Sequence, residues 1–238
     1  MRRKTWVTKS GYRVIQLLSG RSNVFLLTNE RANILIDTGV KFMRGVLESS
    51  LSEMKISHID YLILTHTHFD HVANADWIKK KYGAAVIVHR SEAPYLASGK
   101  GFLPAGTNPF TKILISIAAK KVLTIIKCEP CHYDILVDSW FSLNIFGFNA
   151  YIMHTPGHSQ GSISVIVDDE IALVGDTMVG TFKWTLFPPF GDDVNQLLKS
   201  WEKLLDTKCS LFIPAHGTAN NRSLLVRDLA VHKNKLER

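Results

Sequence analysis

The sequence predicts an α+β fold in which layered sheets are flanked by helices. Short apolar runs rich in β-branched residues fill the first and last thirds of the chain, and segments of helical period lie between and after them. A chain of 238 residues can bury most of its apolar surface without disulfide bonds. We therefore expect the strands to form packed sheets with helices on their outer faces.

Strand and helix patterns alternate in the first third. Three apolar runs separated by Ser-Gly and Asn-Glu-Arg turn signals predict strands. Asp37-Thr38-Gly39 ends the third of them, and a segment of helical period follows. The predicted strands cover residues 14–18, 24–28, 33–36, 59–64 and 84–88, and the predicted helices cover 42–54 and 72–82.

The last third repeats this pattern. Apolar runs again alternate with amphipathic segments, and no internal repeat separates the two parts of the chain. The predicted strands here cover residues 150–153, 163–167, 171–174 and 211–213, and the predicted helices cover 194–205 and 223–235.

The segment 91–130 differs from both parts. It is rich in Pro and Gly at first and then carries an apolar helical stretch over 110–126. We interpret it as a loop-helix insert over a single domain that spans residues 1–238. The helix either packs against the core or a second copy in a homodimer, or forms a lid over an apolar substrate.

The composition indicates the cellular compartment of the protein more clearly than it indicates its binding partners. The three cysteines form no secretory framework, and no apolar run has the length of a membrane span, so we expect a cytoplasmic protein. The net charge of +7 fits an anionic substrate or nucleic acid, but solvated surface faces explain it better. Nucleic acid is therefore a candidate partner that is not favoured over a small-molecule substrate.

The string Thr65-His66-Thr67-His68-Phe69-Asp70-His71 points to metal binding. It follows a predicted buried strand directly. Alternate residues of an extended chain point the same way, so His66, His68 and Asp70 can converge. His71 joins them only if the backbone turns into a helix there. Without a metal, buried neighbouring imidazoles would lack hydrogen-bond partners and repel one another when protonated.

Further ligand-competent residues follow other predicted strands. His158 lies in a Pro-Gly turn between two strands, Asp176 follows the strand over 171–174, and His216 follows the strand over 211–213. Each is weak alone, because a His or Asp at a strand end is more often a cap or a turn residue. Together they complete the ligands that two neighbouring metal ions need.

These seven residues resemble the ligand set of the metallo-β-lactamase superfamily. The resemblance runs from about residue 14 to 217 and implies a four-layer αββα sandwich with a metal site at its edge. Asp37 matches a recurrent structural aspartate of that superfamily. The implied first metal site is His66, His68 and His158, the implied second is Asp70, His71 and His216, and Asp176 would bridge them.

The donor set suits two zinc ions, with iron or manganese as alternatives. Two such ions share a water whose pKa falls to about 7. We therefore predict a hydrolase that cleaves an ester, thioester or lactone with a metal-bridging hydroxide, and Asp70 as a catalytic residue that orients the hydroxide or moves its proton. The alternatives are a phosphodiesterase or nuclease on an anionic substrate, and a mononuclear iron dioxygenase of the persulfide-oxidising type.

Four aromatic residues, Phe182, Trp184, Phe187 and Phe190, follow Asp176 closely. Either they line a substrate groove, or they pack against one another and the core. The homoserine-lactone hydrolases of the superfamily often carry a tyrosine shortly after the bridging aspartate, and this chain has none there. The ligand set by itself does not decide the substrate, because substrate choice depends on the loops around the site.

Overall fold

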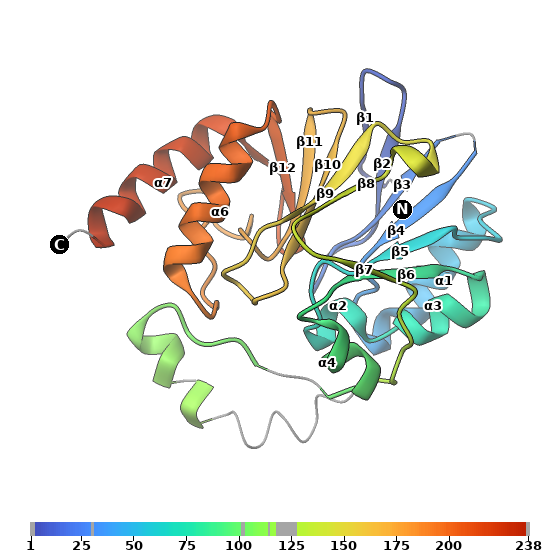
Figure 1. The fold of residues 1–238 in the computed structure, drawn as a ribbon, viewed down its shortest axis with the longest axis horizontal. Coiled ribbons are helices and arrows are strands. Elements are labelled where there is room, and N and C mark those ends of the chain that lie inside the picture. Colours follow the sequence, from blue (N-terminus) through green and yellow to red (C-terminus); the bar gives the residue numbers. More distant parts are fainter. Residues whose placement is uncertain (1–2, 30, 101–102, 114, 118–127, 237–238) are drawn as a thin grey trace.

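The computed structural model describes residues 3–29, 31–100, 103–113, 115–117 and 128–236. Its strands form two sheets that pack face to face, and helices cover both outer faces (Figure 1). The predicted four-layer αββα sandwich is confirmed. Among the described residues, no helix is long and apolar enough to cross a membrane.

The first sheet contains the strands of the N-terminal half. Its order along the sheet is that of the chain, and the neighbours from β4 to β7 pair in parallel. The strands are β1 (Thr5–Val7), β2 (Arg13–Leu18), β3 (Val24–Thr28), β4 (Asn33–Ile36), β5 (Tyr61–Ile63), β6 (Ala85–His89) and β7 (Ile135–Val137).

The second sheet contains the strands of the C-terminal half, in the order β13-β12-β11-β10-β9-β8, and its one parallel pair within the described chain is β11 with β12. The strands are β8 (Trp140–Ser142), β9 (Ala150–His154), β10 (Ile163–Val167), β11 (Ile171–Gly175), β12 (Leu211–Pro214) and β13 (Asn220–Asn221).

Alternation of side chains along the strands builds the layers. In β3, Val24 and Leu26 join the core under the first helical layer, whereas Phe25 and Leu27 join the core between the sheets. Successive side chains of a strand point to opposite faces, so a strand buried on both faces is apolar throughout. This explains why β3 reads as a continuous apolar run.

Helices pack on each outer face. α1 (Arg44–Glu53), α3 (Ala75–Tyr82) and α4 (Ala93–Ser98) contribute to the core of the first sheet. α6 (Val194–Asp206) and α7 (Arg222–Leu236) cover the second sheet, where the buried Trp201 is the largest side chain (Figure 1). The chain also forms two short 3-10 helices, η1 (Lys41–Met43) and η2 (Asn144–Phe146).

Two predicted elements differ from the structure. The helix expected over 72–82 is two helices, α2 (Phe69–Val72) and α3, because the Asn74 side chain between them donates to the carbonyl groups of Thr38 and Val40. In the segment 91–130, α4 buries Ala93 and Leu96 in the core of the first sheet. Residues 109–113 and 115–117 are helical, and the rest of the predicted 110–126 helix lies outside the described residues.

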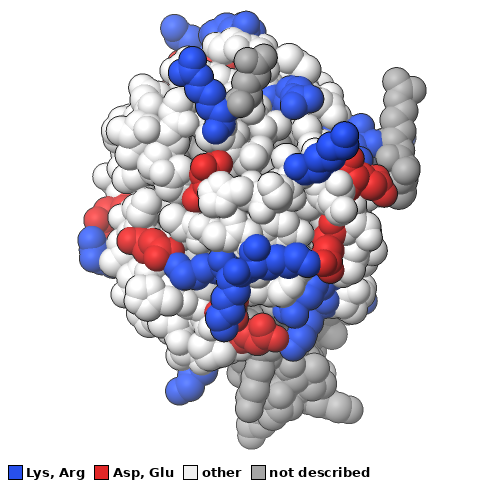
Figure 2. Space-filling view, turned by 90° about the vertical axis from the view of Figure 1, so that its right-hand side faces the viewer, with Lys and Arg blue, Asp and Glu red and all other residues white. Residues whose placement is uncertain are grey.

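The lysine cluster at 79–81 is neutralised by neighbouring carboxylates. Lys79 pairs with Asp134, Lys80 with Asp76 and Lys81 with Glu48. Figure 2 shows positive and negative side chains intermingled on this side of the molecule. The net charge of +7 therefore does not form a continuous basic surface on the face in view.

Candidate metal centre

The candidate ligands and Asp37 meet at the edge where parallel strands of both sheets end. Asp37 follows β4, His66 follows β5, Asp176 follows β11 and His216 follows β12. Carboxyl ends of parallel neighbours lie at the same edge of a sheet, which is where open sheets bind ligands. His158 reaches this edge from the turn between β9 and β10.

A short helix completes the motif after β5. The chain is extended at His68, with φ −66° and ψ 149°, and α2 begins at the next residue. This turn brings His71 back toward the cluster, whereas His68 and Asp70 line the adjoining cavity. His71 was expected to join the other candidate ligands only if the backbone turns into a helix at this point, and the structure shows that turn.

The seven predicted residues form three overlapping groups that could hold metal ions, each with ligand atoms within 4.8 Å of one another. His66 and His71 each belong to two groups, so the groups form one continuous cluster. The groups are His66, His68 and His158; His66, His71 and Asp176; and Asp70, His71 and His216.

Three imidazole nitrogens converge in the first group. Nδ1 of His68 lies 2.9 Å from Nε2 of His66 and 2.9 Å from Nε2 of His158. The Nδ1 of His158 donates to the carbonyl oxygen of Phe190, so its Nε2 is a lone pair in the neutral ring. One hydrogen on His68 would face two lone pairs, and a cation fits this arrangement better.

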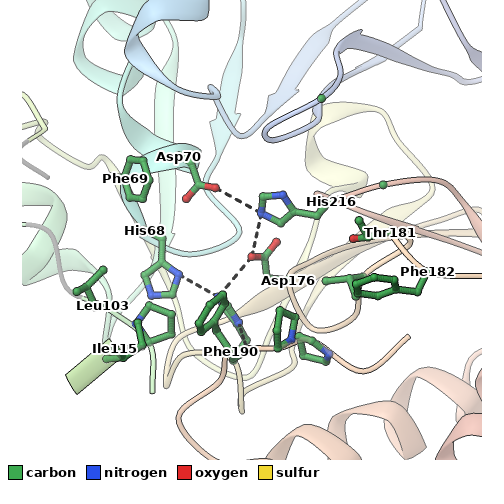
Figure 3. A pocket seen from close by; sticks show the side chains of 17 residues that line it. His68, Phe69, Asp70, Leu103, Ile115, Asp176, Thr181, Phe182, Phe190 and His216 are labelled. Carbon is green, nitrogen blue, oxygen red and sulfur yellow. Dashed lines mark hydrogen bonds and ion pairs between the residues drawn. The ribbon is translucent and has the colours of Figure 1, made fainter. Parts of the chain in front are cut away.

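Two buried atoms in the centre of the cluster also fit a metal. Nε2 of His71 and Oδ1 of Asp176 lack hydrogen-bond partners in the described chain, and 3.6 Å separates them. Buried polar atoms without partners are rare in folded proteins. Asp176 also faces Nε2 of His158 at 3.5 Å and Nε2 of His216 at 3.2 Å, so its carboxylate is central to the cluster (Figure 3).

Electrostatics favour neutral imidazoles at His66 and His68 and a charged imidazole at His216. Burial, and then the neighbouring imidazoles, hold the pKa values of His66 and His68 well below their usual range. Burial also disfavours the charged His216, but Asp176 and Asp70 outweigh it and raise its pKa to about 10. Although burial opposes the charge of Asp176, the surrounding histidines hold its pKa well below the usual range.

Asp37 orients two of the ligands from behind. Its carboxylate accepts hydrogen bonds from the backbone N–H of Thr65 at 2.8 Å, the Thr65 hydroxyl at 2.8 Å and Nδ1 of His71 at 2.9 Å. Because the Thr65 hydroxyl donates to Asp37, it accepts from Nδ1 of His66 at 3.1 Å. Both imidazoles therefore direct Nε2 into the cluster. Carboxylates commonly fix the orientation of metal-binding histidines in this way, by accepting a hydrogen bond from the other ring nitrogen.

Glu92 is a second orienting residue, and the sequence analysis did not identify it. It precedes α4 and is 2% exposed. One carboxylate oxygen accepts from the N–H and hydroxyl of Thr67, and the other accepts from the Ser159 hydroxyl at 2.7 Å and the Gly161 N–H at 3.1 Å. No local motif marks this glutamate, because the polar residues His89, Arg90 and Ser91 precede it and make it resemble a surface residue.

The four aromatic residues after Asp176 divide between the two predicted roles. Phe182 and Phe190 line a cavity beside the cluster. Phe187 stacks on His232 and contacts Trp201 in the core of the second sheet. Trp184 is 69% exposed and contacts Phe182. Packing against other aromatic rings is therefore observed for part of the set, and the position of Phe182 and Phe190 is compatible with a substrate groove.

A four-layer sandwich with a cluster of histidines and aspartates at its edge is the combination of fold and site that characterises one superfamily of proteins. The metallo-beta-lactamase superfamily model matches residues 19–216, and the chain belongs to this superfamily.

The chain is similar to two proteins named as probable metallo-hydrolases and to a superfamily member of known structure. The chain is 29% identical over 212 residues to a probable metallo-hydrolase of Methanocaldococcus jannaschii, across 84% of this chain and 90% of the relative. It is 28% identical to a probable metallo-hydrolase of Bacillus subtilis, across 66% of each chain. The crystal structure of an archaeal superfamily protein from Sulfolobus tokodaii aligns with a TM-score of 0.64 and 22% identity, over 92% of this chain and 85% of that one.

Proposed function

We propose that the protein is a dinuclear metal hydrolase that cleaves an ester, thioester or lactone. The observation that carries the proposal is the pair of outer ligand groups, which the group of His66, His71 and Asp176 joins beside a cavity. A mononuclear iron dioxygenase would need only one such group, so the second group favours the dinuclear hydrolase. The relatives named as probable metallo-hydrolases support the same general reaction class.

Two zinc ions suit the nitrogen and oxygen donors, and iron or manganese remain alternatives. His66, His68 and His158 would hold one ion, Asp70, His71 and His216 the other, and Asp176 would contact both. When bound, such ions lower the pKa of a water molecule to about 7 and polarise a carbonyl oxygen.

Asp70 is the residue that we assign to proton handling. Its Oδ2 lies 3.4 Å from Nε2 of His216, and the side chain lines the cavity instead of being enclosed (Figure 3). Burial opposes the charge of Asp70, but His71 and His216 keep its pKa below the usual range. The carboxylate can therefore accept a hydrogen bond from an attacking water and orient it toward the substrate.

The test is metal analysis combined with hydrolysis assays. We expect about two metal ions per chain in the wild type and fewer in Asp176→Ala, with Asp206→Ala, an exposed aspartate at the end of α6, as the matched control. Hydrolysis of simple esters or thioesters should follow the metal content. One ion per chain after reconstitution, with oxygen consumption, would instead support the mononuclear alternative.

A further inference from the structure

The cavity beside the ligand cluster has two chemically distinct parts. Its volume is about 480 Å³, within the range of small-molecule sites. His68, His158, Asp176 and His216 form the part next to the candidate metal ions. The remaining walls come from other segments of the chain, and they decide which substrates fit beside the reacting bond.

Apolar side chains form these remaining walls on opposite sides of the cluster. Figure 3 shows Leu103 and Ile115 beside His68, and Phe182 beyond Asp176 and His216. Phe190 lies between the two sides. A substrate whose carbonyl lies at the ligand cluster would therefore place its acyl chain against aliphatic and aromatic surfaces.

Within the described part of the chain, the same walls offer no group that would recognise a charge. Among the described residues, no Lys or Arg lines the cavity, and Thr181 is the one lining side chain outside the ligand set that can form a hydrogen bond. A carboxylate or phosphate on the distal end of a substrate would lose its hydration without gaining a partner, which is costly. An uncharged chain would instead gain from leaving water.

We infer that the substrate is a neutral carboxylic ester, thioester or lactone with an apolar acyl chain of several carbons. The inference rests on the proposed hydrolase function and adds the substrate class to it. It argues against substrates with a second anionic group, including the phosphodiester alternative. Ile115 and Phe182 are the walls that would contact the chain.

The experiment compares acyl groups that differ in one property at a time. The metal-loaded protein is assayed with 4-nitrophenyl butanoate, 4-nitrophenyl hexanoate and mono-4-nitrophenyl adipate, and with the corresponding acyl thioesters of N-acetylcysteamine. Each added methylene should raise kcat/KM about fourfold. The adipate, which has the length of the hexanoate and a terminal carboxylate, should react at least about tenfold more slowly.

A positive charge introduced into the cavity wall tests whether this wall contacts the acyl chain of the substrate. Ile115→Lys should shift the ratio of hexanoate to adipate kcat/KM toward adipate by about fivefold. Ile113→Lys is the matched control, because Ile113 is two residues away in the sequence but is 61% exposed and does not line the cavity. The control should leave the ratio within about twofold of the wild type, and metal content should be equal in all three proteins.

The outcomes distinguish a wrong substrate class from a wrong reaction. If butanoate, hexanoate and adipate esters react equally well, the inferred substrate class is wrong and the hydrolase function stands. If Ile113→Lys changes the ratio as much as Ile115→Lys, the assigned binding surface is wrong. If the metal-loaded protein cleaves bis-4-nitrophenyl phosphate and none of the esters or thioesters, the proposed function fails, and the inference fails with it.

Discussion

The Glu92 carboxylate accepts a hydrogen bond of 2.9 Å from the backbone N–H of Thr67, the residue between two of the candidate metal ligands. Its other oxygen holds Ser159 and Gly161, on the turn that presents His158. One buried carboxylate thus ties together two loops, from different sheets, that supply the three histidines of the first ligand group.

Glu92→Gln should weaken metal binding without unfolding the protein. An amide cannot accept at both ends, so its NH₂ group would face either the Thr67 N–H or the Gly161 N–H. We expect about a 10- to 100-fold loss of metal affinity, as for other residues that orient ligands. Competition with a chromogenic chelator measures it. Glu53→Gln, at an exposed carboxylate paired with Arg3, is the control and should match the wild type.

Asp37→Asn should cost both stability and metal affinity. The amide nitrogen would meet either the Thr65 N–H, a clash between two donors, or Nδ1 of His71. In the second case the His71 proton moves to Nε2, which then no longer offers a lone pair to a metal. We expect about 1–3 kcal/mol of lost stability in urea unfolding and at least tenfold weaker metal binding. Equal stability and affinity in the variant would contradict the assigned hydrogen bonds.

Gly217→Ala should disturb the position of His216. Gly217 has φ +89°, and a Cβ there would lie 2.2 Å from the carbonyl carbon of Gly180. Gly11 is a matched control, because it has φ +83° and a Cβ added there would have no atom within 4 Å. We expect Gly11→Ala to cost about 1–2 kcal/mol from backbone strain alone.

In Gly217→Ala the backbone clash adds to this strain, so the loss of stability should be clearly larger and should be accompanied by loss of metal from the Asp70, His71 and His216 group. Thermal unfolding and metal analysis of the two variants provide the comparison. Equal losses of stability in both would show that the close approach of Gly180 and Gly217 is unimportant.

The protein should become less stable in alkaline solution partly because of Cys209. Burial raises the pKa of this thiol from 9.0 to about 11. Between these values the unfolded chain has lost the proton and the native chain retains it, so the free energy of unfolding falls as the pH rises through this window.

Cys209→Ala should therefore show a smaller decrease of unfolding free energy between pH 8 and pH 10.5 than the wild type. Urea unfolding of both proteins at the two pH values measures the difference, and other titrating groups cancel in the comparison. An identical decrease in both proteins would mean that Cys209 ionises equally easily in the native and unfolded states.

Local patterns were sufficient to predict the candidate ligands and most of the sheet framework. The spacing of His66, His68, Asp70 and His71 is a short-range property, and apolar runs such as 163–167 form strands in any fold that buries both of their faces. The three-residue strands β1, β7 and β8 were not predicted, because three residues are too few to establish a period.

The amino-acid sequence was enough to indicate the candidate metal ligands, because side-chain chemistry and position at a strand end are local properties. The three-dimensional fold was needed to place Glu92 between the two loops that carry candidate ligands and to bring Ile115 and Phe182 to one cavity. These relationships join residues 67 and 159 to residue 92, and residue 115 to residue 182. Such contacts depend on how the layers pack, and packing is a property of the whole chain that no short segment records.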